Sequence, residues 1–351
     1  MRLDRRAFLA GCGGLAAAPA FSAMGTAAAT ELPLIKPPAL RPGDTVGLIT
    51  PATYVSDPDT LALAARTVEF FGLKPKLGKN AGKRLGYLGG TDQERLDDLH
   101  AMFRDPEVKA VWPIRGGYGS MHLLDRIDYG LLRKNPKIFV GYSDITALHL
   151  AIQRYSGLVT FHGPVPISSF TPFTQSWFRK ALFETAPLGS VTNPDESNPL
   201  RPAHTLRAIR PGKARGRLAG GNLSLISATL GTPYEIDTRG RILFLEDVDE
   251  QPYAIDRMLT QLRLAGKLRD AAGIVFGECH DCRPREFKPA FESTLSLGEV
   301  LDGILGRLDI PVLSGLAFGH TDDQLTLPLG ATAALDAASA TLTIEEAGVA
   351  A

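Results

Sequence analysis

The sequence has no excess of charge of either sign. Lys and Arg together number 38, as do Asp and Glu, so the formal net charge is zero. With neither a basic field nor a basic stripe, we expect no binding of nucleic acid and no attachment to a membrane surface. Hydrophobic residues at 44% and charged residues at 22% are ordinary values for a soluble globular protein. The 351 residues are enough for two domains. Because the charge is balanced and the composition ordinary, we expect an enzyme or binding protein with a small-molecule partner.

Long apolar runs are also missing, and the N-terminus comes closest to one. Arg5 and Arg6 precede a weakly apolar run rich in Ala and Gly, which ends in Ala27-Ala28-Ala29. This layout predicts a signal peptide over residues 1–29, and Arg-Arg-Ala-Phe-Leu resembles a twin-arginine export signal. The run is too short and too rich in glycine for a stable spanning helix. We therefore expect an exported, periplasmic protein without a membrane span after processing.

Two alternatives for this segment stay open. The first is a disordered tail or a retained anchor in place of a cleaved signal. The second is lipoprotein anchoring, because Leu9-Ala10-Gly11-Cys12 also spells a lipoprotein cleavage box. Only about three apolar residues separate that box from the arginines, too few for the usual apolar region of a signal, so lipidation at Cys12 is the less favoured interpretation.

Cysteine is scarce, with three in the chain. Cys12 would leave with the signal, while Cys279 and Cys282 remain in "GECHDC". In an oxidising compartment this pair could form a tight disulfide. A redox role would need a thioredoxin-like strand and helix, and zinc would need further ligands, since adjacent Cys279 and His280 chelate one metal poorly. We expect a structural pair or two inert thiols, and no metal site.

The pattern of apolar residues predicts an α/β fold. From about residue 40 to 164, strands alternate with helices, including a helix over 57–73 and a capping box, Thr91 with Glu94, at the start of the next. This alternation predicts a parallel sheet in an N-terminal domain over residues 37–165. Residues 166–204 are rich in Pro, Ser and Thr and are interpreted as a surface connection with one helix. Residues 205–347 are predicted to form a mixed, β-rich C-terminal domain.

The stretch "IFVGYSDIT", residues 138–146, combines the end of a buried strand with the start of a helix. Ligands of parallel α/β sheets bind beyond the carboxyl ends of the strands, so Ser143 lies where a site is expected. A sharp turn there would expose its hydroxyl, and the free N–H groups of the following helix suit a developing oxyanion. The alternative is that Ser143 or Asp144 simply caps the helix.

Histidine is also scarce, at seven residues, which narrows the search for a base. His162 follows a strand of the same domain and could line the pocket, and His320 ends "SGLAFGH", where an apolar run breaks at glycine. In "RILFLEDV", Glu246 ends an apolar run and shares one strand face with Ile242 and Phe244. An acid that follows a buried face can reach into a cleft.

A glycine turn, "RGGYGS" at residues 115–120, follows another predicted strand. Paired glycines let the backbone approach a ligand and offer N–H donors, although a plain tight turn has the same composition. No Gly-Lys-Ser/Thr follows, so a phosphate loop is not favoured.

Seven motifs occur together and in this order: "RGGYGS", "FVGYSDIT", "FHGP", "GGNLSLI", "LGTPYE", "FLEDVDEQPYAIDRML" and "LSGLAFGH". Together they resemble the LD-carboxypeptidase family, serine peptidases of the muramoyltetrapeptide carboxypeptidase type, over residues 37–346. The resemblance implies that Ser143 is the nucleophile, Glu246 orients the base and His320 is the base. It also implies two domains with the active site at their interface, and commonly a homodimer.

Two further site predictions concern the groups around Ser143. We expect the oxyanion on the N–H groups of Asp144 and Gly117. Arg115 either pairs with a substrate carboxylate or forms a salt bridge within the fold.

The resemblance implies hydrolysis of the L,D-peptide bond that releases terminal D-Ala from peptidoglycan tetrapeptides, with a muropeptide or stem peptide as partner and no cofactor. One alternative is a microcin C-type self-immunity peptidase, for which Trp177 is a candidate to stack on a base. The other is a non-catalytic muropeptide-binding protein, which loss of a triad member would favour.

Overall fold

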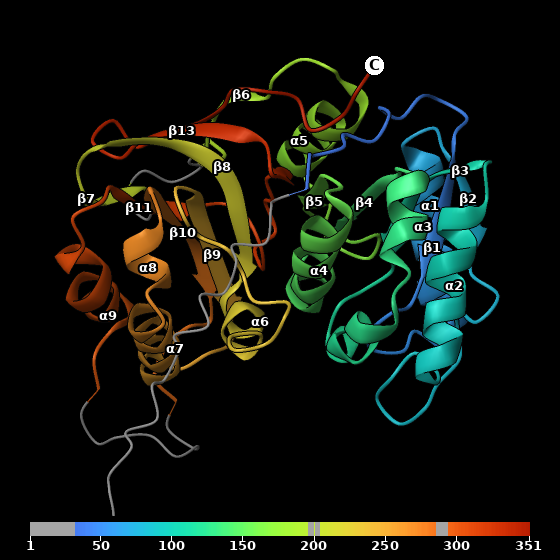
Figure 1. The fold of residues 1–351 in the computed structure, drawn as a ribbon, viewed down its shortest axis with the longest axis horizontal. Coiled ribbons are helices and arrows are strands. Elements are labelled where there is room, and N and C mark those ends of the chain that lie inside the picture. The colour runs from blue at the N-terminus through green and yellow to red at the C-terminus, as the bar shows by residue number, and fades with distance from the viewer. Residues whose placement is uncertain (1–31, 196–199, 201–203, 286–293) are drawn as a thin grey trace, which may run out of the picture. The chain divides into compact units, whose positions relative to one another are not determined.

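The computed structural model describes residues 32–195, 200, 204–285 and 294–351. The predicted signal peptide, with Arg5, Arg6 and Cys12, lies outside these residues. The described chain forms two sheets with helices packed against them, as Figure 1 shows, which confirms the predicted α/β class. Among the residues described, no helix is long and apolar enough to cross a membrane.

The first sheet has six strands in the order β12-β5-β4-β3-β1-β2. Their bounds are β1 Thr45–Ile49, β2 Lys74–Leu77, β3 Val108–Pro113, β4 Ile138–Gly141, β5 Thr160–His162 and β12 Leu327–Leu329. The strands from β1 to β5 pair in parallel, and β12 pairs antiparallel to β5. The carboxyl ends of the parallel strands therefore lie at one edge, where ligands bind in such sheets.

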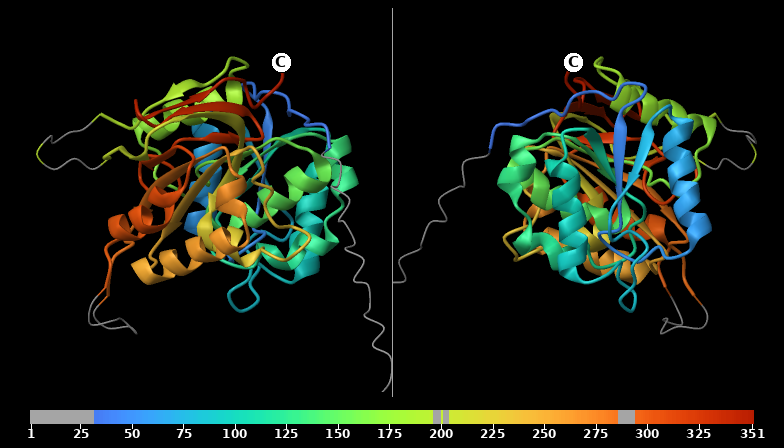
Figure 2. Two further views of the ribbon diagram at one scale, coloured as in Figure 1. Left: turned by 60° about the vertical axis from the view of Figure 1, so that its left-hand side comes forward. Right: turned by 90° about the vertical axis from the view of Figure 1, so that its right-hand side faces the viewer.

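Helices cover both faces of this sheet, as the right-hand view of Figure 2 shows. The helices are α1 Pro58–Phe70, α2 Asp92–Arg104, α3 Tyr129–Lys134, α4 Thr146–Ser156 and α5 Pro172–Phe183, with short 3₁₀ turns η1 Ser120–Arg126 and η2 Ser143–Ile145. One buried cluster joins α1 and α5 to the sheet, and a second joins α2, α3 and α4 to it. Burial on both faces explains why the inner strands β1, β3 and β4 are mostly apolar, whereas the edge strand β2 is largely exposed.

Side-chain caps define where these helices begin. The carboxylate of Asp57 accepts hydrogen bonds from the N–H groups of Asp59 and Thr60 at the start of α1. At the start of α2, Thr91 and Glu94 form the predicted capping box, in which each side chain accepts from the other residue's N–H. Such caps satisfy N–H groups that the helix itself leaves without partners.

The second sheet has eight strands in the order β6-β14-β13-β8-β9-β10-β11-β7. Their bounds are β6 Gly189–Val191, β7 Arg207–Arg210, β8 Lys213–Asn222, β9 Ile242–Val248, β10 Gly273–His280, β11 Val312–Leu316, β13 Thr332–Asp336 and β14 Thr341–Ile344. Strands β8 to β11 are parallel neighbours, while the flanking pairs are antiparallel. The sheet is therefore mixed, as predicted.

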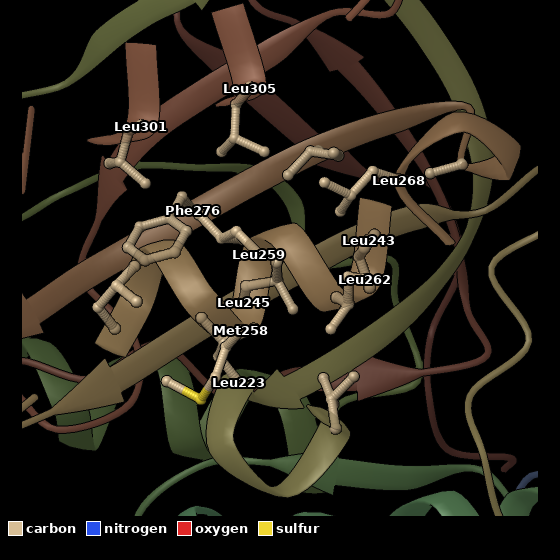
Figure 3. Close-up of a cluster of buried hydrophobic side chains, with 14 of the residues drawn as sticks. Leu223, Leu243, Leu245, Met258, Leu259, Leu262, Leu268, Phe276, Leu301 and Leu305 are labelled. Carbon is tan, nitrogen blue, oxygen red and sulfur yellow. The ribbon is translucent and has the colours of Figure 1, made fainter. Parts of the chain in front are cut away.

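One face of the second sheet packs on helices through the cluster drawn in Figure 3. The elements that cover it are α6 Leu223–Ala228, α7 Pro252–Leu264, α8 Lys267–Asp270, α9 Leu297–Ile304 and η3 Leu305–Arg307. Leu243 and Leu245 of β9 point into this cluster, whereas Ile242 and Phe244 belong to the cluster on the other face. Strand alternation therefore places Glu246 on the side of Phe244, away from these helices.

The two sheets are interleaved along the chain more than the predicted domain boundaries suggest. Strand β12, from residues 327–329, completes the first sheet, although the sequence analysis places it in the C-terminal domain. The predicted surface connection, 166–204, contributes α5 to the core of the first sheet and β6 to the edge of the second. Its helix has a buried face that includes Phe178 and Leu182, so this part of the segment is core rather than surface.

Candidate active site

Ser143 lies in a sharp turn between β4 and α4. Its backbone φ is +63°, in the left-handed region that residues other than glycine rarely adopt. The N-cap residue of the turn η2 is Tyr142, and that of the following helix α4 is Ile145. No side chain forms a capping hydrogen bond at either position, so neither Ser143 nor Asp144 acts as a cap. The capping interpretation is therefore wrong, and the strained turn points to a functional role for the hydroxyl.

The structure brings Ser143, His320 and Glu246 together. His320 lies 177 residues from Ser143 and 74 residues from Glu246 in the sequence. The Nε2 atom of His320 lies 3.1 Å from Oγ of Ser143. Its Nδ1–H donates to Oε2 of Glu246 at 2.7 Å. The Glu246 side chain is fully buried, whereas that of His320 is 18% exposed. The imidazole therefore lies between the buried carboxylate of Glu246 and the hydroxyl of Ser143.

Burial and charge oppose each other in this group. Burial alone would raise the pKa of Glu246, but the hydrogen bond and charge of His320 outweigh it and hold that pKa below its usual range. Burial alone would likewise lower the pKa of His320, but the hydrogen bond and charge of Glu246 raise it above its ordinary value. Each partner therefore favours the charged form of the other, as a base and its orienting acid require.

Gly319 makes room for the carboxylate beside His320. A Cβ atom at this position would lie 2.3 Å from Oε2 of Glu246, and the backbone φ is +87°. Only glycine fits both requirements without moving the acid. The Gly-His pair of "SGLAFGH" thus supplies the imidazole and the space for its partner.

The glycine turn after β3 lies against Ser143. A Cβ on Gly116 would come within 3.3 Å of Oγ of Ser143 and 3.2 Å of the amide nitrogen of Asp144. A Cβ on Gly117 would instead lie 2.3 Å from Oγ1 of Thr53. Gly116 is therefore the glycine that leaves space beside the Ser143 hydroxyl, and oxyanion donation by the N–H groups of Asp144 and Gly117 stays a prediction.

The sequence comparisons bear directly on this arrangement. Residues 46–163 match the family model described as the LD-carboxypeptidase N-terminal domain, and residues 215–335 match the LD-carboxypeptidase C-terminal domain. A Bacillus subtilis protein named probable murein peptide carboxypeptidase is 48% identical over 319 residues, which cover 90% of this chain and 95% of that protein. The chain belongs to the LD-carboxypeptidase family.

Solved structures agree with this family assignment. A muramoyltetrapeptide carboxypeptidase from Oxalobacter formigenes superposes with a TM-score of 0.73 at 32% identity, covering 88% of this chain and all of that one (100%). The microcin C7 self-immunity protein MccF superposes with a TM-score of 0.80 at 30% identity, covering 90% of this chain and 100% of its own. The fold is therefore shared by relatives whose names state different activities.

Within this LD-carboxypeptidase fold, a cleft of about 590 Å³ opens beside His320. Its lining residues are Tyr142, Ile167, Ser168, Ser169, His204, Val248, His280, His320, Thr321, Asp322, Asp323 and Gln324. Arg115 is exposed and, among the residues described, forms no ion pair. The salt bridge within the fold that the sequence left open is therefore not observed among the described residues, and Arg115 is not one of the residues that line this cleft.

Several residues near the triad were not predicted from the sequence. The Tyr142 ring lies 4.8 Å from that of His320, centroid to centroid, and burial raises the pKa of its hydroxyl. The Asn222 amide donates to Asp247 at 3.1 Å, and its backbone N–H donates to Thr146 of α4 at 3.0 Å. Asn222 ends β8 directly before α6, and Ser143 likewise lies between a strand and a helix, so the same signal could have identified Asn222.

His204 and Asp323, which line the cleft, form a second polar group with Glu278. Nδ1 of His204 lies 2.5 Å from Oε1 of Glu278, and its Nε2 lies 3.5 Å from Oδ2 of Asp323. These three residues come from separate segments, and His204 lies in a Pro-rich stretch with no periodic pattern. No local signal in the sequence marks them.

Cys279 and Cys282 form a disulfide, the structural pair that was one of the two expectations. Cys279 pairs with Asp247 in the β9–β10 register, so the bridge lies one strand away from the strand of Glu246. Among the described residues, no group of three or more His, Cys, Asp or Glu side chains is placed to hold a metal ion.

The pH dependence of hydrolysis follows from the His320–Glu246 pair. A base must be neutral to accept a proton, and the pKa of His320 is raised, so kcat/KM should increase with pH with a midpoint above about 6.5. Changing Glu246 to Gln removes the charge that raises this pKa, so the midpoint should move to lower pH. The plateau should also fall, by about 10²–10⁴-fold, because the imidazole loses its orienting acceptor.

A series of kcat/KM measurements between about pH 5 and pH 9 checks this expectation for both proteins. A midpoint that stayed in place or rose in the Glu246→Gln variant would contradict the assigned role of the carboxylate. Circular dichroism at each pH controls for loss of the fold.

Proposed function

We propose that this family member is a serine carboxypeptidase that releases terminal D-Ala from peptidoglycan tetrapeptides by hydrolysing the L,D-peptide bond. The observation that carries the proposal is the chain of contacts from Ser143 through His320 to Glu246, with distances of 3.1 Å and 2.7 Å. Relatives whose names state murein peptide or muramoyltetrapeptide carboxypeptidase activity support the substrate class.

The proposed reaction proceeds in two steps. In the first, Oγ of Ser143 attacks the carbonyl carbon of the scissile bond while Nε2 of His320 accepts the hydroxyl proton. The tetrahedral oxyanion is held by the N–H of Asp144 and that of Gly117. The C–N bond then breaks, His320 returns the proton to the leaving amine, and D-Ala departs with an acyl-enzyme left on Ser143.

In the second step, a water molecule replaces the amine. His320 takes a proton from the water as it attacks the ester carbonyl, and returns that proton to Oγ of Ser143 when the ester bond breaks. Glu246 holds Nδ1–H throughout, which leaves Nε2 free to face the substrate. The products are the tripeptide and the regenerated enzyme.

The assay for this proposal uses the mature protein with L-Ala-γ-D-Glu-meso-diaminopimelate-D-Ala and measures the released alanine together with its configuration. A matched tetrapeptide that ends in L-Ala tests the stereochemistry of the bond, and a D-Ala-D-Ala pentapeptide tests for D,D activity. We expect release from the first peptide alone. Binding of the tetrapeptide without release would favour the non-catalytic alternative.

Similarity to MccF keeps a self-immunity peptidase as the second candidate, since that structure superposes over 90% of the chain. The specific candidate for stacking on a base does not support it. Trp177 of α5 is 7% exposed, packs in a buried cluster and does not line the cleft beside His320. A peptidyl nucleotide added to the same assay distinguishes the two functions, and we expect no hydrolysis of it.

Arg115 is proposed to pair with the terminal carboxylate of the substrate. Changing it to Met should raise KM by about 10–100-fold, the equivalent of one lost hydrogen bond between charged groups. A tetrapeptide with a C-terminal carboxamide is the matched substrate, because it has no carboxylate to lose. Equal effects of Arg115→Met on both peptides would contradict the proposed pairing.

We also propose export to the periplasm by the twin-arginine route, on the basis of Arg5 and Arg6. Changing both to Lys should leave the precursor inside the cell, as cell fractionation and immunoblotting would show. A Cys12→Ser variant should be exported as before, because lipidation is not expected. An unchanged periplasmic yield of the double Lys variant would count against this route.

A homodimer is proposed from the family resemblance. Sedimentation equilibrium of the mature protein checks it, and a monomer mass at concentrations used in the assay would contradict it.

A further inference from the structure

His162 is a buried histidine that the reaction described above does not use. It ends β5, is fully buried, and neither ring nitrogen has a hydrogen-bond partner among the residues described. Aromatic rings surround it: those of Phe244, Phe318 and Tyr142 lie 5.3, 6.2 and 6.3 Å away, centroid to centroid. One nitrogen of a neutral imidazole always carries a proton, so His162 brings a buried N–H donor that needs an acceptor.

Glu246 presents an acceptor of the matching kind. Its Oε2 receives the Nδ1–H of His320, but its Oε1 is buried and has no hydrogen-bond partner among the described residues. The Asn222 amide donates to Oδ1 of Asp247 at 3.1 Å, and its hydrogen bonding toward Glu246 helps to lower the pKa of that carboxylate. The Glu246 carboxylate therefore has the Asn222 amide beside it, while its Oε1 keeps acceptor capacity for a further donor.

The fold places these two groups on facing elements. His162 pairs with Gly141 in the β4–β5 register, two residues before Ser143, and so belongs to the sheet of the nucleophile. Glu246 belongs to β9 of the other sheet, on the same side as Phe244, whose ring contacts that of His162. His162 and Glu246 also act on each other electrostatically, and His320 is the other charged neighbour of His162.

We propose that His162 is a positioning residue whose ring N–H holds the Glu246 carboxylate through Oε1, the oxygen that His320 does not use. The proposed contact is either direct or through one bridging water, and either form restrains the carboxylate. A carboxylate held at both oxygens cannot turn, so it keeps His320 in the tautomer and direction that Ser143 requires.

Burial suits His162 to this task. It lowers the pKa of His162 to about 4, so the ring is neutral at the pH of the reaction. A neutral donor orients Glu246 without cancelling the negative charge on which the basicity of His320 depends. A lysine or arginine in the same place would compete with His320 for that charge.

A purely structural role is the alternative. The hydroxyls of Thr160 and Thr326 are also buried without partners among the described residues, and Thr326 packs against the backbone of Gly163, which follows His162. If His162 serves only these neighbours, its loss would change stability but would not interact with a change at Glu246.

A double-mutant cycle separates the two roles. His162→Phe keeps an aromatic ring at this position and removes the N–H donor. The change should lower kcat about 10–100-fold with KM nearly unchanged, because His162 acts through Glu246 and not on the substrate. In a Glu246→Gln background the same change should cost less than about 3-fold, since the carboxylate it positions is gone. His162→Gln, which keeps an N–H donor, should recover part of kcat and stands in if the Phe variant does not fold.

His149 supplies the matched control. It is equally buried in the same half of the molecule, but its Nε2 lies 2.9 Å from the carbonyl oxygen of Gly141, and the charged group that acts on it is His162 and not Glu246. His149→Phe should change kcat by the same factor in both backgrounds. Equal factors for His162→Phe in both backgrounds, or no loss of kcat, would overturn the proposal.

This inference rests on the proposed function, so the experiment includes a readout that needs no peptide. The rate at which a fluorophosphonate modifies Ser143 reports the same Ser-His-Glu chain. The cycle compares the wild type, the two single variants and the double variant. If the tetrapeptide is not hydrolysed but these four proteins show the coupling in modification rate, the substrate assignment fails and the role of His162 stands. If hydrolysis occurs without coupling in either assay, the role of His162 fails alone.

Discussion

Ser143→Ala is expected to lower kcat for D-Ala release by about 10⁶-fold, the typical cost of removing the nucleophile of a serine-peptidase triad. Without Oγ, the imidazole of His320, 3.1 Å away, has no proton to accept and no acyl-enzyme forms. Further change of His320 to Ala in the same protein should add little, because the members of a triad act as one unit. The measurement is single-turnover release of D-Ala, with thermal unfolding as the control for the fold.

The same position tests whether the turn stores strain. The φ of +63° costs Ser143 and an alanine about equally, whereas a glycine adopts it freely. Ser143→Gly should therefore be as inactive as Ser143→Ala but more stable, by about 0.5–1 kcal/mol after the greater flexibility of glycine in the unfolded chain is subtracted. Equal unfolding free energies for the two variants would mean that the turn is not strained, and D-Ala release by either variant would reject the mechanism.

Gly116→Ala is expected to lower kcat by about 10²–10³-fold, similar to the loss of one oxyanion donor. The added methyl would lie 3.2 Å from the amide nitrogen of Asp144 and 3.3 Å from Oγ of Ser143, in the space where the substrate oxygen must develop its charge. Gly116 does not have a positive φ, so the backbone accepts alanine there. Stability should fall by about 1–3 kcal/mol, since the added methyl would also lie 3.0 Å from Cβ of Ser143 and the neighbours must shift.

Two other glycines provide controls for this prediction. Gly303 lies in α9 with nothing within 4 Å of an added Cβ, so Gly303→Ala should leave kcat unchanged. Gly117 has a φ of +105° and a Cβ there would meet Thr53, so Gly117→Ala should destabilise the fold. A Gly116→Ala variant with wild-type kcat would show that the space beside Ser143 is not used by the substrate.

Patterns that depend on neighbours in the chain could be predicted well. The capping box at Thr91 and Glu94 forms because its two side chains lie within one helical turn. The alternation in β9 placed Ile242, Phe244 and Glu246 on one side, because the strand period is two. The run from β4 into α4 likewise located Ser143 beyond the end of a parallel strand, although helix capping remained an alternative until the turn was seen.

Features that depend on distant segments were missed or misplaced. Trp177 lies in a stretch that looks like a surface connection, yet its side chain is buried. Strand β6 of the same stretch pairs with β14 of the second sheet, and Trp177 packs in one cluster with Val191 of β6. Strand β12 belongs to the first sheet although its neighbours in sequence belong to the second. The space at Gly116, rather than at Gly117, depends on which face of the turn meets Ser143, and composition is the same for both.

The amino-acid sequence was sufficient for the α/β class, for the strand-to-helix turn at Ser143 and, through resemblance to a family, for the three residues of the triad. Those signals are local or are carried by motifs. The tertiary structure alone decided that Ser143, His320 and Glu246 meet within hydrogen-bonding distance, and that the ring of His162 in one sheet contacts the ring of Phe244 in the other. Such meetings depend on how two sheets pack through side chains far apart in sequence, and no periodicity along the chain encodes that packing.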